Sequence, residues 1–568
     1  MHNGTTPSQT LQIGYLKELN FAIISPIVDD EISLRGKIAT DGVIFDTIIS
    51  LPKKVPPSYP TFYLVDSGLE LKEPHIERPH LHDLSKNSKN NIVCRACIRE
   101  EQEKFYSSSP VDILHYLYKD FVGLCSKIAC KEFDSRDEIF KEFDSYWPNN
   151  IDICWDIQGM PMDCTLYEQI TLQYHSKDTV TLYILTDRAN IVTDFANKNG
   201  WLYKKEKSIY IDIEDKMPIP LPYTYGDLIK LLKKTNKFEQ FKKLEKHTTS
   251  QLFFIGFNLA NGKKHFVGAW MNALPVKGKR KKSNKVTGIM HSPLHQMSYF
   301  LGGHVESINY NRLMQRGGNK MNAALSSKQK KVAIVGCGSI GSIIAFKLSK
   351  SGIRDFVLID PEKLKVSNIG RHQLGMSCVG DNKAIALSKY LESHFIGLKA
   401  IYSTNKVESS DVIELLPDVD LIITAIGSDA PAVEPWLANK VCKGLLPQML
   451  TCWLEADAVS GHALSTKQGN SFDFDKACNT LNILKSDYAT SLLKKEVGCN
   501  STYMPYGFLD ADAHISHMAR FALSLLNGNN NNKNAMSSFG DIEFYEKWID
   551  RDIHSWTVVE HNNEALSL

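Results

Sequence analysis

Three glycines with the spacing of a nucleotide-binding turn stand out in the second half of the chain. Gly336, Gly338 and Gly341 follow the apolar run KVAIV and precede a helical pattern. Such glycines let the chain turn sharply and let a phosphate approach the backbone, while the amide groups of the following helix attract its charge. Asp360 ends the next apolar run about 20 residues later, where a carboxylate can bind ribose hydroxyl groups. These residues predict a bound nucleotide.

Polar side chains after Asp360 indicate which nucleotide this is. Asn368 and Arg371 follow in DPEKLKVSNIGRHQ, and Lys383 follows in VGDNKAIAL near a predicted helix start. Fixed cations beyond the ribose suit a triphosphate whose negative charge grows as it is attacked, whereas dinucleotides rarely need them. Asp429 follows the apolar run DLIITAIG, where a carboxylate can hold Mg²⁺ against phosphate oxygens. We therefore expect ATP and Mg²⁺, with NAD and hydride transfer as the alternative.

A parallel sheet would bring these residues together. Residues 326–530 alternate strand patterns with helical patterns, beginning with KVAIVGCG, FVLID, KAIYSTNKV and DLIITAIG. This alternation predicts a parallel sheet covered by helices on both faces. The carboxyl ends of its strands meet at one edge, where nucleotides bind in such folds.

The chain of 568 residues is too long for one hydrophobic core and predicts about three domains. We expect an α/β protein with an α+β domain at residues 1–145, a connecting α/β domain at 146–304, and the Rossmann-like nucleotide-binding domain at 305–568.

Within the first domain, the prolines of PKKVPPSYPTFYLVD predict a sheet edge, because proline cannot donate to a neighbouring strand. The run SSSPVDILHYLYKDFVGLCSKI predicts a capped amphipathic helix. In the second domain, TVTLYILTD, SIYIDI, QLFFIGFNL and KHFVGAWM predict strands, and YGDLIKLLKKTNKFEQFKKLEK predicts one charged helix.

The composition argues against membrane and specific nucleic-acid partners. A formal net charge of +2 is too small for general electrostatic binding to DNA or anionic lipid. We interpret the basic run KGKRKKSNK at Lys277–Lys285 as a solvated loop. No run of about 18 apolar residues and no secretory leader is visible, which predicts a cytoplasmic protein. Its 12 cysteines are then expected to be reduced thiols.

The motifs GCGSIGS, IDPEKLKVSNIGRHQ, VGDNKA and AIGSDA occur in this order over residues 305–525. Together they resemble the adenylation domain of ubiquitin-activating enzymes and their bacterial relatives in the ThiF/MoeB superfamily. The resemblance implies that a protein C-terminal carboxylate attacks the α-phosphate of ATP, giving an acyl-adenylate and pyrophosphate. It assigns ATP to Gly336, Gly338, Gly341 and Asp360, the phosphates to Asn368, Arg371 and Lys383, and Mg²⁺ to Asp429.

Two positions depart from the family pattern. Glu362 and His372 stand where the family often has aspartate and glutamine, which leaves their roles open. Family members also often work as dimers that lend an arginine across the interface. Arg316 and Arg312 are candidates for that arginine in a homodimer, and an ordinary surface arginine is the alternative.

An acyl-adenylate can be passed to a cysteine, because a thioester keeps the acyl group activated. Cys499 lies in EVGCNSTYMPYG, which resembles the loop that bears the thioester cysteine in bacterial enzymes fusing activating and conjugating modules. A buried structural thiol is the alternative, with Cys478 as the reserve candidate. The segment EADAVSGHAL also resembles that family, and its His462 could serve only to pack or orient the chain.

The N-terminal domain resembles ubiquitin-conjugating folds in FDTIISLPKKVPPSYPTFYL and in PHLHDLSKNSKNNIVCRACIRE. On that resemblance Cys94 is the second acyl acceptor, with Cys97 as its rival and a redox or half-zinc C-x-x-C pair as a further alternative. The His-Pro-Asn signature of eukaryotic conjugating enzymes is missing. The oxyanion-stabilising group is therefore unassigned, and His80 or His82 is only a candidate base.

The three parts in one chain resemble the fused ubiquitin-transfer-like proteins of bacterial antiphage systems that signal with cyclic oligonucleotides (CBASS). The resemblance implies that the substrate is the C-terminus of a cGAS/DncV-like nucleotidyltransferase, relayed from Cys499 to Cys94 and joined to an amine on another molecule. The alternative is adenylation for sulfur-carrier or cofactor biosynthesis, with an N-terminal domain that only docks a partner.

Overall fold

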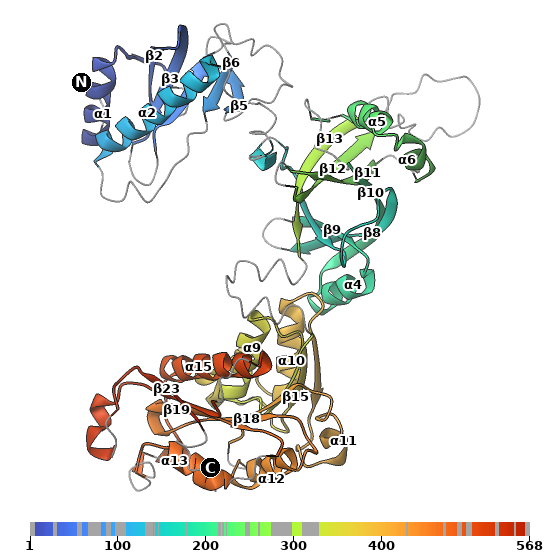
Figure 1. Cartoon of the computed structure of the whole chain (residues 1–568), viewed down its shortest axis with the longest axis vertical. Helices are drawn as coiled ribbons and strands as arrows, with labels where there is room; N and C mark the ends of the chain where they lie inside the picture. The colour runs from blue at the N-terminus through green and yellow to red at the C-terminus, as the bar shows by residue number, and fades with distance from the viewer. Residues whose placement is uncertain are drawn as a thin grey trace.

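The computed structural model has the α/β fold class expected from the sequence, and Figure 1 shows the whole chain. It describes residues 6–26, 31–53, 59–65, 81–86, 92–96, 109–130, 140, 143–145, 147–175, 179–213, 217, 221–222, 224–244, 250–259, 262–273, 298–308, 329–427, 430–469, 473–485, 491–492, 494–495, 502–528, 533–549 and 553–562.

The first domain is an antiparallel sheet covered by two helices. The strands lie in the order β1-β2-β3-β4-β6-β5 and are β1 (Ala22–Ile24), β2 (Ile32–Thr40), β3 (Val43–Leu51), β4 (Thr61–Val65), β5 (Leu81–Lys86) and β6 (Ile92–Ala96). The helices are α1 (Pro7–Glu18) and α2 (Pro110–Ala129). Helix α2 is the predicted amphipathic helix, and the Ser109 hydroxyl accepts the Asp112 amide at its start.

The expected sheet edge at the proline-rich run is wrong. The strands at the two ends of this run are both interior strands. Strand β3 pairs with β2 and β4, and strand β4 pairs with β3 and β6. Pro52 and Pro60 lie just outside these strands, so they interrupt no ladder.

The middle domain is a closed barrel with strand order β10-β11-β12-β13-β7-β9-β8. Its strands are β7 (Asp152–Asp156), β8 (Thr165–His175), β9 (Thr179–Thr186), β10 (Leu202–Asp212), β11 (Ser250–Asn258), β12 (Lys264–Ala273) and β13 (Ser298–Ser307), and the short helix η2 (Phe143–Ser145) precedes them. The four predicted strands are all present. Helix α4 (Ala189–Lys198) joins β9 to β10.

The single charged helix predicted after β10 is two helices, α5 (Tyr225–Lys234) and α6 (Phe238–Leu244). The break falls at Asn236, whose φ of 58° lies in the left-handed region that ends helices. Lys237 then forms a largely buried ion pair with Asp163, which fixes the start of the second helix against the barrel.

The C-terminal domain contains the predicted parallel sheet. Its strand order is β16-β15-β14-β17-β18-β19-β22-β23, in which the first five strands are parallel and the last three antiparallel. The strands are β14 (Lys331–Val335), β15 (Asp355–Ile359), β16 (Lys399–Ser403), β17 (Leu421–Thr424), β18 (Met449–Leu454), β19 (Ser460–Thr466), β22 (Ala535–Phe539) and β23 (Val558–His561). A separate small pair is formed by β20 (Lys494–Lys495) and β21 (Thr502–Tyr503).

Helices cover both faces of this sheet. One buried cluster joins it to α9 (Ser339–Lys350), α10 (Lys383–His394) and α15 (Phe508–Leu526). The other joins it to α11 (Ser410–Ile413), α12 (Ala430–Cys442) and α13 (Phe474–Leu481). The short helices are η3 (Val366–Arg371), η4 (Met376–Cys378), η5 (Ala456–Ala458) and η6 (Glu543–Trp548).

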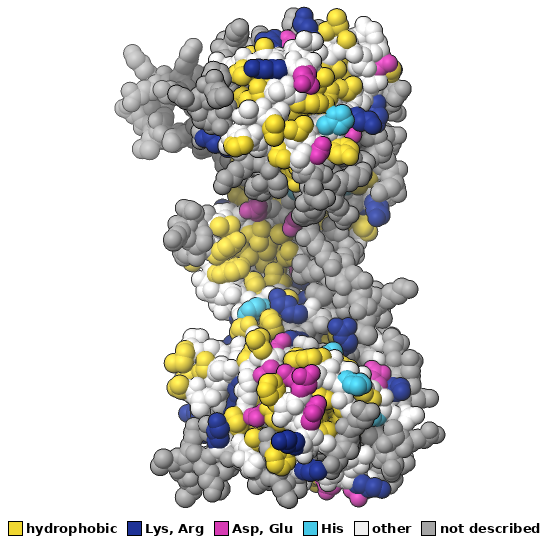
Figure 2. All heavy atoms as spheres, turned by 90° about the vertical axis from the view of Figure 1, so that its left-hand side faces the viewer, with side chains coloured by type: hydrophobic (Ala, Val, Ile, Leu, Met, Phe, Trp, Pro, Cys, Tyr) yellow, Lys and Arg dark blue, Asp and Glu magenta, His cyan; other side chains and the backbone are white. Residues whose placement is uncertain are grey.

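The barrel contacts the C-terminal domain through helices α4 and α10 (Figure 1). Lys198 on α4 forms an ion pair with Glu392 on α10 at 2.9 Å, and Ile396 packs against a barrel cluster that includes Val192 and Ala196. Lys and Arg side chains are scattered over the face shown in Figure 2 rather than gathered in one patch. Among the described residues, no helix combines the length and apolarity needed to cross a bilayer.

Candidate nucleotide-binding site

The glycine turn lies between buried strand β14 and helix α9. Gly336 has a φ of 91°, and a Cβ atom there would lie 2.4 Å from the Ala425 carbonyl oxygen. A Cβ atom on Gly341 would lie 1.9 Å from the Gly336 carbonyl oxygen. Gly338 is the N-cap of α9 and has no side chain to block the first helical amides. The sequence thus folds here into a tight turn that only glycine fits at two positions.

A cavity of about 350 Å³ opens beyond this turn, at the carboxyl edge of the parallel strands. Six residues assigned to the nucleotide from the sequence line it: Gly336, Gly338, Asp360, Asn368, Arg371 and Lys383. Gly341 does not line the cavity, because its place is the contact between the helix and the turn. The size and the single edge position suit one nucleotide.

Asp360 directly follows β15 and is 5% exposed. Its two carboxylate oxygens accept the backbone amides of Cys337 and Glu362, each at 2.8 Å. Burial raises the pKa of Asp360, and the nearby Lys383 charge and both amides oppose that rise. The carboxylate is thus fixed at the cavity wall by two backbone amides.

Lys383 is the first residue of α10 and is 7% exposed. Its Nζ lies 2.6 Å from Glu362 Oε2, so the role left open for Glu362 is that of a partner to this lysine. The preceding Asn382 accepts the amides of Ala384 and Ile385, and its Nδ2 donates to the Asp360 carbonyl at 2.8 Å. These contacts fix a cation at the cavity wall before any ligand binds.

Arg371 ends η3 and faces a segment far away in the sequence. One guanidinium nitrogen donates to the Met504 carbonyl at 3.2 Å, and the guanidinium lies 5.1 Å from the centre of the Tyr506 ring. The Ser339 hydroxyl at the start of α9 donates to the Arg371 carbonyl at 2.7 Å. Asn368, in the same short helix, accepts the Lys365 amide at 3.0 Å.

His372 holds the backbone of the glycine turn. The Leu374 amide donates to its Nδ1 at 3.0 Å, so Nε2 carries the proton and donates to the Cys337 carbonyl at 2.8 Å. Burial, with a contribution from the Lys383 charge, lowers the pKa of His372 to about 4. The side chain is therefore neutral at physiological pH and serves to hold the backbone of the glycine turn.

The cavity wall also includes Lys406, Glu408 and Tyr506, which were not identified from the sequence. Lys406 and Glu408 come shortly after β16 in the chain. This position could have identified them as cavity residues, because every parallel strand ends at the binding edge of the sheet. No local signal marked Tyr506, which reaches the cavity from a distant segment through its contact with Arg371.

A buried carboxyl group lies behind the cavity wall. Glu434 on α12 is 7% exposed and accepts hydrogen bonds from the Thr424 side chain and the Ile426 amide. Burial raises the pKa of Glu434 to about 7. Since Ile426 lines the cavity, this group supports the loop that follows β17.

Several predicted site residues lie outside the described residues: Asp429, Arg312, Arg316, Cys499, Cys97 and His80. Cys94 lies in β6 opposite Leu64 and His82 lies in β5, but their side chains are not described. Cys478 lies on α13, and burial raises the pKa of its thiol to about 12. This thiol is a poor source of thiolate, which disfavours it as the reserve acyl acceptor.

Comparison with known proteins gives the site its context. Residues 310–467 match the model of the ThiF family. A stretch of 125 residues is 33% identical to the ATP-dependent ubiquitin transferase-like protein Cap2 of Enterobacter hormaechei and covers 21% of each chain. A stretch of 284 residues is 25% identical to ubiquitin-like modifier-activating enzyme 5 of Rattus norvegicus, over 47% of this chain and 64% of the rat protein.

Both matches span less than two thirds of the relative's own length. A crystal structure of E. coli MccB with ATP aligns over 43% of this chain and 65% of the MccB chain, at 16% identity and a TM-score of 0.31.

Proposed function

We propose that this chain uses ATP to activate the C-terminal carboxylate of a partner protein and passes it through Cys499 and Cys94 to an amine. The ThiF-family match and the activating-enzyme relatives support ATP-dependent adenylation. The observation that carries the proposal is that the glycine turn, Asp360, Lys383 and Arg371 line one and the same cavity. The turn and the carboxylate suit a nucleoside, and the two cations suit its phosphates.

In the first step a carboxylate oxygen of the partner attacks the α-phosphorus of ATP. The bond from this phosphorus to the bridging oxygen breaks, and pyrophosphate leaves with the bonding electrons. Lys383 and Arg371 would neutralise the charge that grows on the leaving group. Lys383 is fixed in place, whereas Arg371 would exchange its contact with the Met504 carbonyl for one with phosphate.

Mg²⁺ belongs to the same proposal. Gly427 lines the cavity and Asp429 follows it closely in the sequence, so that its carboxylate is a candidate ligand of the type that Mg²⁺ prefers. When bound, Mg²⁺ neutralises phosphate oxygens. We also predict that Arg316 reaches across a homodimer interface to the ATP site of the partner subunit, and this stays a prediction.

In the later steps the acyl group moves to sulfur and then to nitrogen. The Cys499 thiolate would attack the acyl carbon and release AMP, and the Cys94 thiolate would then displace Cys499. An amine would finally attack the Cys94 thioester, losing a proton and releasing the thiol. We propose as partner the C-terminus of a cGAS/DncV-like nucleotidyltransferase, in a CBASS setting in the cytoplasm.

The relay is tested by mixing the full chain, ATP and candidate partner proteins, and by resolving adducts on non-reducing gels. We expect a thiol-sensitive adduct that disappears in Cys499→Ala, and that is retained without product in Cys94→Ala. Cys478→Ala, which removes a thiol of raised pKa, is the matched control and should behave like the unmodified protein. Products that persist in Cys94→Ala would instead favour adenylation with a docking N-terminal domain. An adduct that persists in Cys499→Ala would contradict the relay.

A further inference from the structure

A buried acid–base pair lies in the C-terminal domain and has no part in the reaction described so far. Glu455 follows β18 and is 8% exposed, and His462 lies in β19 and is fully buried. Glu455 Oε1 lies 2.8 Å from His462 Nε2. On the other side of the ring, Nδ1 lies 2.8 Å from the Ser537 hydroxyl oxygen. Burying such a pair is costly unless every polar atom finds a partner.

The partners of Glu455 show what the pair does. Its Oε1 also accepts hydrogen bonds from the Ser460 hydroxyl at 2.6 Å and from the Ile483 amide at 2.7 Å. Its Oε2 accepts a hydrogen bond from the Leu484 amide at 2.9 Å. Burial raises the pKa of Glu455, but His462 and these donors more than compensate and keep the net pKa below its usual value. A carboxylate held in its charged form thus fixes two successive backbone amides just after α13.

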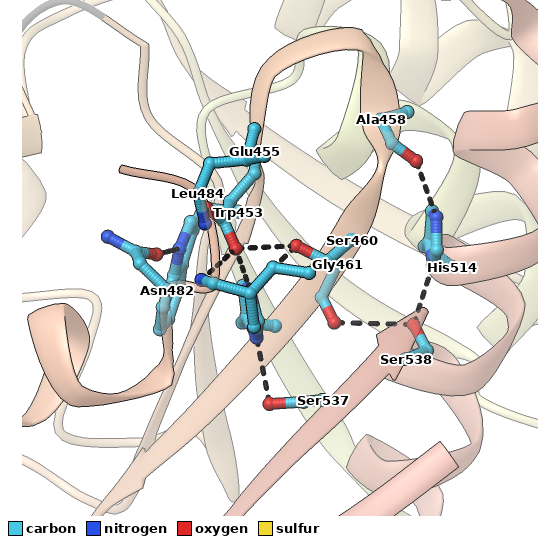
Figure 3. Close-up of polar contacts among 12 residues, drawn as sticks. Trp453, Glu455, Ala458, Ser460, Gly461, Asn482, Leu484, His514, Ser537 and Ser538 are labelled. Carbon is cyan, nitrogen blue, oxygen red and sulfur yellow. Dashed lines mark hydrogen bonds and ion pairs between the residues drawn. The ribbon is translucent and has the colours of Figure 1, made fainter. Parts of the chain in front are cut away.

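The turn that presents Glu455 is strained. Asp457 and Ala458 have φ angles of 54° and 53°, in the left-handed region that non-glycine residues avoid. Such conformations are unfavourable and persist where the surroundings hold them. Here His514 Nε2 donates a hydrogen bond to the Ala458 carbonyl at 2.7 Å (Figure 3). Burial lowers the pKa of His514. Contacts with the surrounding structure therefore hold this strained turn, which follows Glu455 directly in the chain.

The backbone fixed by Glu455 begins the segment that contains Cys499 in the sequence. The Trp453 indole donates to the Asn482 side chain at 2.9 Å, next to the two fixed amides (Figure 3). At the far end of the segment, Met504 packs in the same apolar cluster as Ile483 and Leu484. The two ends of the segment therefore meet at one place.

That meeting point touches the nucleotide cavity. The Met504 carbonyl accepts a hydrogen bond from Arg371, and Tyr506 lines the cavity itself. A continuous set of contacts thus runs from Glu455 through the apolar cluster to a cation at the cavity wall.

We propose that Glu455 and His462 are positioning residues that act as a clamp: they hold the start of the segment that contains Cys499, at Ile483 and Leu484, in the apolar cluster that also includes Met504. The inference rests on the proposed function and adds to it the control of acyl transfer from the adenylate to Cys499. Misplacement by about 1 Å, even through a distant residue, can cost about 10²-fold in rate. The clamp should therefore matter for transfer to sulfur and much less for formation of the adenylate.

Rapid-quench measurements on the full chain test this by following adenylate formation and thioester formation in one turnover. Glu455→Gln has one oxygen where the carboxylate has two, so it leaves at least one buried amide donor unpaired. We expect it to slow thioester formation by about 10- to 100-fold while ATP–pyrophosphate exchange stays nearly constant. His462→Leu should act alike, whereas His462→Gln, which keeps a donor for Glu455, should recover much of the rate.

The control is Ser388→Ala, which removes a buried hydrogen bond to the Ala400 carbonyl in the same domain. It should change neither step. If Glu455→Gln lowers both steps equally, or if His462→Gln is no better than His462→Leu, the pair is only structural and the inference is wrong. If the unmodified protein exchanges pyrophosphate but forms no thioester with any partner, the relay and the inference both fall, and adenylation stands alone.

Discussion

Replacing Lys383 with methionine separates the proposed role of this lysine in the reaction from its role in the fold. Lys383 is 7% exposed, and methionine fills a similar volume without charge. The Glu362 side chain is 65% exposed, so water can solvate its carboxylate once the lysine is gone. Asp360 loses the nearby charge that opposes the rise of its pKa, so we expect the free energy of unfolding to fall only modestly, by about 1 kcal/mol.

The effect on the reaction should be much larger. In the proposed reaction charge grows on pyrophosphate as it leaves, and Lys383 would be a cation already fixed beside that charge. Loss of one such fixed donor costs about 10²- to 10³-fold in rate, or about 2.7–4 kcal/mol. The assay is ATP–pyrophosphate exchange by the full chain with a partner protein present, alongside thermal unfolding of the same samples.

The matched control is Lys347→Met, which removes a lysine of the same domain whose Nζ lies 2.9 Å from Asp512 and which does not line the cavity. It should exchange pyrophosphate at the normal rate. An unchanged rate in Lys383→Met would refute the role of this cation, and a large fall in its unfolding temperature would refute the separation of the two roles.

Three other substitutions test the site and its support. Gly336→Ala forces a side chain into φ of 91° and toward the Ala425 carbonyl, so the C-terminal domain should lose about 2–5 kcal/mol and its unfolding temperature should fall. Arg371→Lys keeps the charge but loses the planar contact with Tyr506, and should slow exchange about tenfold, the worth of one charge-assisted hydrogen bond. Glu434, with its pKa raised to about 7, favours the folded state when protonated, so its contribution of about 3 kcal/mol is complete below about pH 4.5 and is lost as the pH rises through 7. Glu434→Gln cannot titrate, so urea unfolding should show this pH dependence in the unmodified protein and not in the variant.

The parts of the site that sequence reasoning found are those encoded locally. The glycine turn follows β14 and Asp360 follows β15, and the parallel pairing of these two short apolar strands places their ends together without further information. Lys383 was found from the helix start in VGDNKAIAL, which is also a local signal. Local turn chemistry likewise predicted helix α2 from its serine cap. Periodicity and turn residues are sufficient for such features.

The parts that it missed depend on pairing between distant segments. The barrel closes because β13 pairs in parallel with β7, and nothing in either strand's alternation specifies that partner. Tyr506 reaches the cavity through Arg371, and Glu455 binds Ile483 and Leu484, again across long stretches of chain. The motif EADAVSGHAL was noticed, but only the structure showed which backbone its buried pair holds.

The central claim is that this chain adenylates a protein C-terminus. Its most direct test is ATP–pyrophosphate exchange by the full chain with a cGAS/DncV-like partner, compared with the same partner lacking its last residues and with the partner omitted. We predict label exchange that requires the intact C-terminus and falls sharply in Lys383→Met. Exchange that is absent with every partner, while the nucleotide that binds the cavity is NAD rather than ATP, would contradict the claim.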